Sequence, residues 1–189
     1  DGLFAIAEIH RAAGSYTDLV DTLHRVIDVG GATLEDIVIE GVYMQLGAIF
    51  DEKLLQPADA VEAYGRAVEL NPRNFGAMDA LERIHGAETR WEDCIEIKNK
   101  RVQALEDPRQ KIQVLLDIAK MCSEKLEAPA QAILPFTQII RLDPLHDFAF
   151  SQLEALYRGQ ARFAELIELY VARVEASESV DERVRLLRK

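Results

Sequence analysis

Apolar residues recur along the chain with the spacing of amphipathic helices. Ala60, Tyr64, Ala67 and Val68 stand at positions i, i+4, i+7 and i+8, which places them on one helix face. No stretch shows the sustained alternation that is typical of a strand. The pattern, divided by its start and stop residues, predicts helices at 3–13, 16–29, 34–53, 57–70, 75–87, 90–105, 108–126, 129–142, 147–159 and 162–176, and the start of another at 180–189.

Local signals refine this prediction at three places. Asp107 before a proline indicates an N-cap followed by Pro in the first turn, and Thr89 with Glu92 is typical of a capping box. Pro135 is the seventh residue of the helix expected at 129–142, where it removes a backbone hydrogen bond and should kink the helix.

The chain repeats itself. The stretch AVEAYGRAVELNP at 60–72 is followed 72 residues later by AILPFTQIIRLDP at 132–144. The same shift aligns Trp91 with Phe163, and a shift of 75 aligns Tyr16 with Trp91. Repetition at a fixed period indicates a tandem array in which each unit stacks on the next. We therefore expect five antiparallel helix pairs, at 1–30, 34–72, 75–106, 108–144 and 147–176.

Residues 40–72 resemble the tetratricopeptide repeat. That family has an aromatic, a Leu, a small residue and an aromatic on its first helix, then Ala, an aromatic and Ala on its second, with Pro just beyond. The matching residues are Tyr43, Leu46, Gly47, Phe50, Ala60, Tyr64, Ala67 and Pro72. A looser match at 112–144 includes Ala132, Phe136 and Pro144, and we expect Trp91 and Phe163 in the core at equivalent apolar positions.

The resemblance implies an all-α, right-handed superhelical α-solenoid that covers residues 1–189 as one domain. Both ends match the interior of a repeat, so we expect a piece of a longer array. Within a pair we expect Gly47 to face Ala60, with the Tyr64 ring filling the space toward the next pair. The third and fifth pairs, which are shorter than the second and fourth, depart from the family pattern through Glu82, Lys98 and Arg101, and again through Glu154 and Arg173. The half-a-tetratricopeptide type of RNA-processing proteins is a less favoured alternative.

Charge and motifs narrow the function. The net charge is −11, and residues 1–72 hold 13 acidic and 4 basic residues, which disfavours nucleic acid and could attract a basic partner. No apolar run is long enough to insert into a membrane. No catalytic, cofactor or metal motif occurs, so we expect neither an enzyme nor a bound cofactor. Cys94 and Cys122 are interpreted as buried small hydrophobes, and His10, His85 and Tyr157, which share a repeat position, as packing residues.

What remains is a surface for protein partners. In the resembled family the first helices of the pairs line a concave groove that binds peptide segments. The residues expected to line it here are Met44, Ala48, Asp51, Gln113, Leu116 and Lys120. An apolar or basic partner segment suits them. The hypothesis is a non-catalytic interaction scaffold, with a structural spacer or the regulatory arm of an enzyme as alternatives. A cytoplasmic location is favoured, and apolar end faces could pair two copies end to end.

Overall fold

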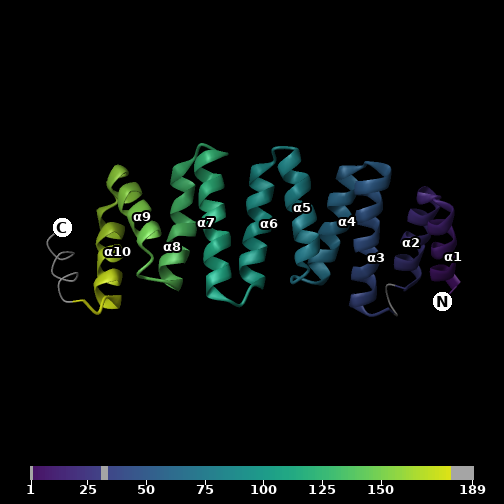
Figure 1. Cartoon of the computed structure of the whole chain (residues 1–189), viewed down its shortest axis with the longest axis horizontal. Coiled ribbons are helices and arrows are strands. Elements are labelled where there is room, and N and C mark those ends of the chain that lie inside the picture. Colours follow the sequence, from purple (N-terminus) through teal and green to yellow (C-terminus); the bar gives the residue numbers. More distant parts are fainter. Residues whose placement is uncertain (1, 31–33, 180–189) are drawn as a thin grey trace. The chain divides into compact units, whose positions relative to one another are not determined.

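The computed structural model describes residues 2–30 and 34–179 of the chain. Within these residues there are ten α-helices and no strand, and consecutive helices pack as antiparallel pairs (Figure 1). The chain divides into two compact units, Asp1–Ala104 (unit 1) and Leu105–Lys189 (unit 2). The predicted all-α array of helix pairs is confirmed. A continuous superhelix over residues 1–189 stays a prediction, and the helix expected at 180–189 lies outside the described residues.

Both units are built from helices whose bounds follow the predicted pattern closely. In unit 1, the helices are α1 (Gly2–Ala13), α2 (Tyr16–Gly30), α3 (Asp36–Ile49), which a π-helical turn extends over Phe50–Leu54, α4 (Pro57–Leu70), α5 (Phe75–Ala87) and α6 (Trp91–Ala104). In unit 2, they are α7 (Pro108–Glu124), α8 (Ile133–Leu142), which follows a 3-10 turn at Pro129–Ala132, α9 (Asp147–Gly159) and α10 (Phe163–Ala176). Asp107 caps α7 as predicted, since its carboxylate accepts the Arg109 N–H at 2.9 Å.

The backbone repeats with the same period as the sequence. Gly14, Thr89 and Ala161 all have left-handed backbones, with φ of 70°, 58° and 54°. They stand 75 and 72 positions apart, which are the two shifts that align the sequence. Leu55 and Glu127, also 72 apart, are left-handed as well. The capping-box prediction for Thr89 is wrong. Thr89 turns the chain between two helices with a left-handed backbone, whereas an N-cap residue has an extended one.

A shared turn explains why the phrase ending in Leu-Asn/Asp-Pro occurs twice. The Asn71 side-chain oxygen accepts the Arg73 N–H at 2.9 Å, and the Asp143 carboxylate accepts the Leu145 N–H at 3.1 Å. Each is the turn in which Asn or Asp bonds the backbone two residues on. The prolines between donor and acceptor, at 72 and 144, follow the helix ends as predicted.

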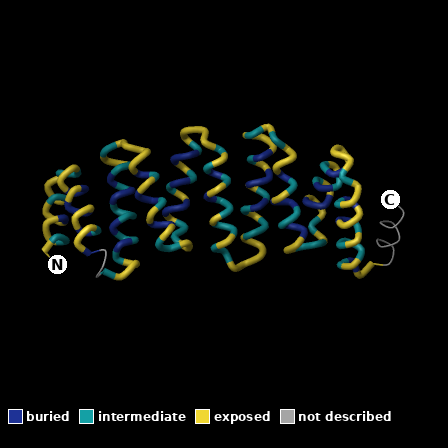
Figure 2. Tube along the Cα trace, turned by 180° about the vertical axis from the view of Figure 1, so that it is seen from behind, coloured by how far each residue is buried: buried dark blue, intermediate teal, exposed yellow. Residues whose placement is uncertain are grey.

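The core of each unit consists of the helix faces that meet between neighbouring helices (Figure 2). Leu46, Ala60, Tyr64 and Ala67 are all buried, as the repeat pattern predicts. One contact differs from the expectation. A Cβ on Gly47 would lie 2.6–2.8 Å from three ring atoms of Tyr64, so the side chain nearest to Gly47 is this ring and not Ala60. The missing side chain of Gly47 is what lets the ring lie against the backbone of α3.

Pro135 does not kink a long helix, which corrects the prediction. The segment at 129–142 divides into a 3-10 turn, Pro129–Ala132, and α8, which begins at Ile133. Pro135 is therefore the third residue of α8. The first turn of a helix has no intrahelical partner for its N–H groups, so the missing N–H of Pro135 removes no hydrogen bond there. Ala132 and Phe136 are buried at this junction, as expected.

Two aromatic residues expected in the core differ in their burial. Phe163 is 61% exposed, so its assignment to the core is wrong. The next residues on its face, Ile167 and Val171, are exposed as well. Among the described residues α10 packs on α9 through Leu166 and Leu169, and nothing covers its opposite face. Trp91 is half-buried.

The departures from the family pattern form one polar cluster in the third helix pair. Glu82 receives the Lys98 ammonium at 2.7 Å and the Arg101 guanidinium at 3.0 Å. All three side chains are 16–19% exposed. The carboxylate that replaces a small residue on α5 is thus compensated by the two cations that replace apolar residues on α6. These substitutions function together, as a buried charge requires.

The positions equivalent to Glu82, Lys98 and Arg101 carry other residues in the fifth and first helix pairs. In the fifth pair Glu154 accepts a hydrogen bond from the Tyr170 hydroxyl and pairs with Arg158 at 2.8 Å. Burial, and then the hydrogen bond to Glu154, raise the pKa of Tyr170 to about 12. In the first pair the three positions are apolar and buried, and are occupied by Ala7, Leu23 and Val26. The fold therefore accepts either a compensated polar cluster or a fully apolar one at this site.

Candidate functional site

Two of the three predicted partner-binding residues on α7 line an open groove in unit 2. Leu116 and Lys120 contribute to it, and Gln113 is exposed one turn earlier on the same helix. The groove has a volume of about 450 Å³ and runs between α7, α8 and the start of α9. We call it the α7–α9 groove. Its lining residues are Leu116, Asp117, Ala119, Lys120, Ser123, Glu124, Phe136, His146, Phe148 and Gln152.

The floor of the α7–α9 groove is apolar and has one exposed aromatic side. The Phe136 ring is buried, and the Phe148 ring meets it edge to face, with ring centroids 6.0 Å apart. Phe148 itself is 55% exposed. An apolar groove with a few polar groups around it is typical of a binding surface.

Polar groups surround this apolar floor. Asp117, Lys120 and Glu124 contribute one positive and two negative charges along α7, and within the described residues none of the three is in an ion pair. His146 caps α9, because its Nδ1 accepts the Ala149 N–H at 3.2 Å. The proton of the neutral imidazole is therefore on Nε2, which leaves a hydrogen-bond donor at the groove.

The equivalent face in unit 1 is filled by its own side chains. Met44, Ala48 and Asp51, the other predicted partner-binding residues, are all partly buried. The Met44 methyl group lies 3.8 Å from the position that a Cβ on Gly76 would take, so it packs on the start of α5. Asp51 forms an ion pair with Arg83 of α5. The sequence pattern treats these two faces alike, but Leu116 and Lys120 line the α7–α9 groove, whereas Met44 and Asp51 contact α5.

A polar bridge adds to this difference between the two faces. Glu40 of α3 accepts hydrogen bonds from the Asn71 and Asn74 side chains, at 2.9 and 2.7 Å. The residues 72 positions later are Ile112, Asp143 and His146, which cannot form the same bridge. Phe148 stands at the position equivalent to Gly76. Sequence reasoning missed Phe148, although a Phe in place of Gly within an otherwise matching repeat was a usable signal.

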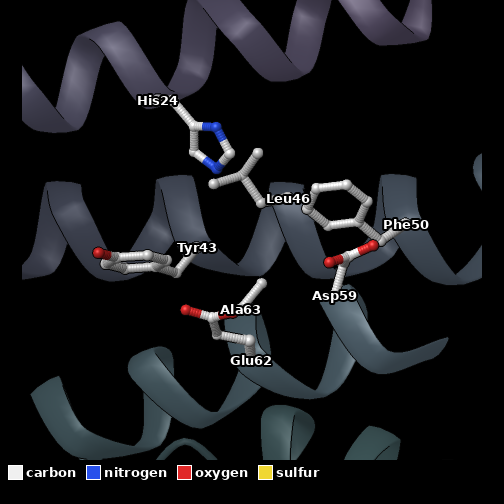
Figure 3. Close-up of a pocket in the computed structure, with 7 residues that line it drawn as sticks. All are labelled: His24, Tyr43, Leu46, Phe50, Asp59, Glu62 and Ala63. Atoms are coloured by element: carbon white, nitrogen blue, oxygen red, sulfur yellow. The ribbon is translucent and has the colours of Figure 1, made fainter. Parts of the chain in front are cut away.

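A second pocket lies in unit 1, on the side of α3 that faces α2 and α4 (Figure 3). We call it the α2–α4 pocket, and its volume is about 150 Å³. Its lining residues are His24, Tyr43, Leu46, Phe50, Asp59, Glu62 and Ala63. The Tyr43 and Phe50 rings lie on either side of Leu46, and the Asp59 and Glu62 carboxylates lie across from α3 (Figure 3). The sequence pattern assigned the aromatic residues to the repeat and left His24 without a role.

Reactive side chains elsewhere are buried away from these surfaces. Burial raises the thiol pKa of Cys94 and of Cys122, so neither is an activated nucleophile. His85 is 4% exposed, and its Nδ1 has no hydrogen-bond partner among the described residues. Burial, and then the nearby Arg90, lower the pKa of His85. Three metal-ligand side chains do not gather anywhere in the part of the chain that is described.

Comparison with known proteins gives a structural likeness without a sequence match. No family model matches the chain, and no curated protein matches it. Two solved structures of MamA are similar, with TM-scores of 0.45 and 0.46 and 14% identity; they cover 90% and 92% of this chain and 93% and 88% of theirs. Pseudomonas aeruginosa pilF is similar with a TM-score of 0.41 and 15% identity, over 98% of this chain and 80% of its own.

The repeats in the sequence and in the backbone define the class of protein. Helix pairs that repeat in sequence, in helix bounds and in left-handed backbone positions define a helical-repeat protein. None of the helices in residues 2–30 and 34–179 is long and apolar enough to cross a membrane.

Proposed function

We propose that this chain is a non-catalytic protein-interaction scaffold, and that the α7–α9 groove binds a segment of a partner protein. The proposed segment presents a bulky apolar side chain to the groove and carries a basic residue beside it. The observation that supports this most directly is the 55% exposure of Phe148 beside an apolar floor formed by Leu116, Ala119 and Phe136.

The apolar part of the proposed interaction supplies most of its free energy. Burying one aromatic side chain that was exposed to water is worth about 1.5–3 kcal/mol. The partner's anchor contributes a similar amount when it enters the groove. Association also costs translational and rotational freedom and the ordering of the segment. We therefore expect micromolar or weaker affinity for a short segment in isolation.

The charges at the groove favour a basic residue next to the anchor. Asp117 and Glu124 outnumber Lys120, and within the described residues no cation pairs with either carboxylate. An Arg or Lys of the segment would find an acceptor at one of them. The Nε2–H of His146 is available to a backbone carbonyl of the same segment. Such polar contacts set the direction and specificity of binding more than its strength.

Selection from a display library of random peptides tests this proposal. The critical variant is Phe148→Glu, and the matched control is Phe163→Glu, which changes an equally exposed Phe (61%) on α10, outside the groove. Enriched peptides should share an apolar anchor next to Arg or Lys, bind wild type and Phe163→Glu alike, and bind Phe148→Glu at least about tenfold more weakly, which is a difference of about 1.4 kcal/mol. Far-UV circular dichroism checks that both variants are folded.

Other outcomes point to other functions. If no peptide is enriched, the chain is better described as a structural spacer. If enriched peptides bind Phe148→Glu as well as wild type, the partner surface lies elsewhere. The regulatory arm of an enzyme would require a catalytic domain in the same polypeptide, and end-to-end pairing of two copies stays a prediction for sedimentation analysis.

A further inference from the structure

We propose that the α2–α4 pocket of unit 1 binds the guanidinium group of an arginine side chain from a partner protein. This site is separate from the α7–α9 groove and does not depend on the function proposed for it. Carboxylates, aromatic rings and a buried apolar floor surround this one small cavity.

The two carboxylates of the pocket are available to a ligand. Asp59 and Glu62 stand three residues apart on α4, so they project from the same face of the helix. Within the described residues neither accepts a side-chain hydrogen bond or belongs to an ion pair. The next cation on α4, Arg66, instead pairs with Glu69 at 2.8 Å. Two carboxylates near each other favour a cation with several donors.

The aromatic rings favour arginine over lysine. Tyr43 is on α3, Phe50 begins the π-helical turn that extends it, and the two rings lie on either side of Leu46 (Figure 3). A planar guanidinium stacks on such rings and at the same time donates to carboxylates, whereas an ammonium is a compact, strongly hydrated charge. Leu46 and Ala63, both buried, form an apolar floor for the methylene stem of the side chain.

The size of the pocket sets what can enter it. Its volume of about 150 Å³ is that of a cavity able to hold a benzene ring, which is enough for one side-chain head group. A helix or a nucleotide would not fit.

The negative charge of the surrounding chain also favours a cationic ligand. Residues 1–72 have a net charge of −9, which attracts a cation over distance and repels phosphates. A metal ion is disfavoured, because no three metal-ligand side chains come together in the described residues.

The test uses the whole chain and three short peptides, which are Ac-Gly-Ser-Arg-Ser-Gly-NH2 and the same peptide with citrulline or lysine in place of arginine. Citrulline keeps the shape of arginine but has no charge. Amide chemical shifts in a 15N-labelled protein report where each peptide binds. The arginine peptide should shift resonances around His24, Tyr43 and Asp59, a lysine peptide should bind more weakly, and the citrulline peptide should cause no comparable shifts.

Two variants with the same change in net charge separate this site from general electrostatic attraction. Asp59→Asn/Glu62→Gln removes the pocket charges, and Glu92→Gln/Glu96→Gln removes two exposed charges from α6 of the same unit. The first should weaken binding of the arginine peptide by about tenfold or more, as expected for charge-assisted hydrogen bonds. The second should leave it within about twofold, since these charges are outside the pocket and solvent screens their effect on it.

Three results would overturn the proposal. They are equal shifts with arginine and citrulline, shifts that fall outside the pocket, and equal loss of binding in both double variants. The first comparison uses only the wild-type protein, so it decides the question even if a variant fails to fold.

Discussion

The contact between Gly47 and the Tyr64 ring leads to a prediction in which one substitution changes sign with its context. In Gly47→Ala the new Cβ would lie 2.6–2.8 Å from three carbon atoms of the ring. An ordinary carbon–carbon contact is about 3.5–4.0 Å, so the overlap is close to 1 Å. The ring cannot move away easily, because it is 6% exposed and packed in the core of unit 1.

Two opposing effects determine the size of the change. Overpacking a core costs about 1–3 kcal/mol, and three ring atoms in conflict place this site in the upper half of that range. Alanine is better than glycine in a helix by about 1 kcal/mol. The free energy of unfolding of Gly47→Ala should therefore fall by about 1–2 kcal/mol.

Removing the ring should reverse this effect. Tyr64→Ala alone should cost about 3–5 kcal/mol, because it empties a buried aromatic site. In that background Gly47→Ala meets no ring, so only the helix preference remains and the double variant should be more stable than Tyr64→Ala by about 0.5–1 kcal/mol. Gly41→Ala is the matched control on the same helix, since nothing lies within 4 Å of its new Cβ; it should stabilise the wild type by a similar amount.

Urea unfolding followed by the fluorescence of Trp91 measures these differences. Trp91 is the only tryptophan of the chain and belongs to unit 1, as Gly47 and Tyr64 do. The four proteins of the cycle give the coupling between the two sites directly. The reasoning is refuted if Gly47→Ala stabilises the wild type as Gly41→Ala does, or if it destabilises the protein equally with and without the ring.

Three further predictions concern residues of the third helix pair. Glu82→Gln leaves Lys98 without its carboxylate and Arg101 with only the exposed Asp79, and it should cost about 1–3 kcal/mol in urea unfolding. Glu82→Ala/Lys98→Leu/Arg101→Val, which copies the first pair, should be as stable as wild type, and an equal loss in both variants would contradict a compensated cluster. Because burial lowers the pKa of His85, the unfolded chain binds the proton more readily, so the protein should lose stability as the pH falls below about 6.5 toward the lower folded pKa. His85→Tyr, which introduces the residue found at the equivalent position in the fifth pair, should lose less stability over this pH range. If the stability of the wild type and of His85→Tyr depends on pH in the same way, the prediction is wrong. Thr89→Gly should stabilise the protein by about 1 kcal/mol in urea unfolding, because a left-handed backbone strains a β-branched residue; no gain would contradict this.

Helix positions could be predicted well because they depend on local physics. The spacing of apolar residues, prolines at helix starts and Asn/Asp-Pro at helix ends act within one or two turns of the chain. Residue pairs such as Asp107–Pro108 are therefore informative without tertiary contacts. Two local predictions were wrong, at Thr89 and Pro135, because the same residues are compatible with a second local conformation. Thr89 is in a left-handed turn, and Pro135 is in the first turn of a new helix.

The candidate sites were predictable only in part. The repeat pattern indicated Leu116 and Lys120 as groove residues, because it identifies the faces of the first helices. It could not separate them from Met44 and Ala48, which occupy the same repeat positions. The α2–α4 pocket was not predicted at all, since its residues come from three helices and only their packing brings them together.

The sequence by itself determined that this protein is a repeated array of antiparallel helix pairs, because hydrophobic period and turn chemistry are encoded within short stretches of chain. Only the tertiary structure decided which of two equivalent faces is open. That depends on contacts across helices, such as the Asp51–Arg83 pair and the Met44 methyl against Gly76 in unit 1, and on Phe148 standing where Gly76 stands. A pattern of apolar and polar residues records which face each side chain is on, and the partner on the facing helix determines whether that face is filled or free.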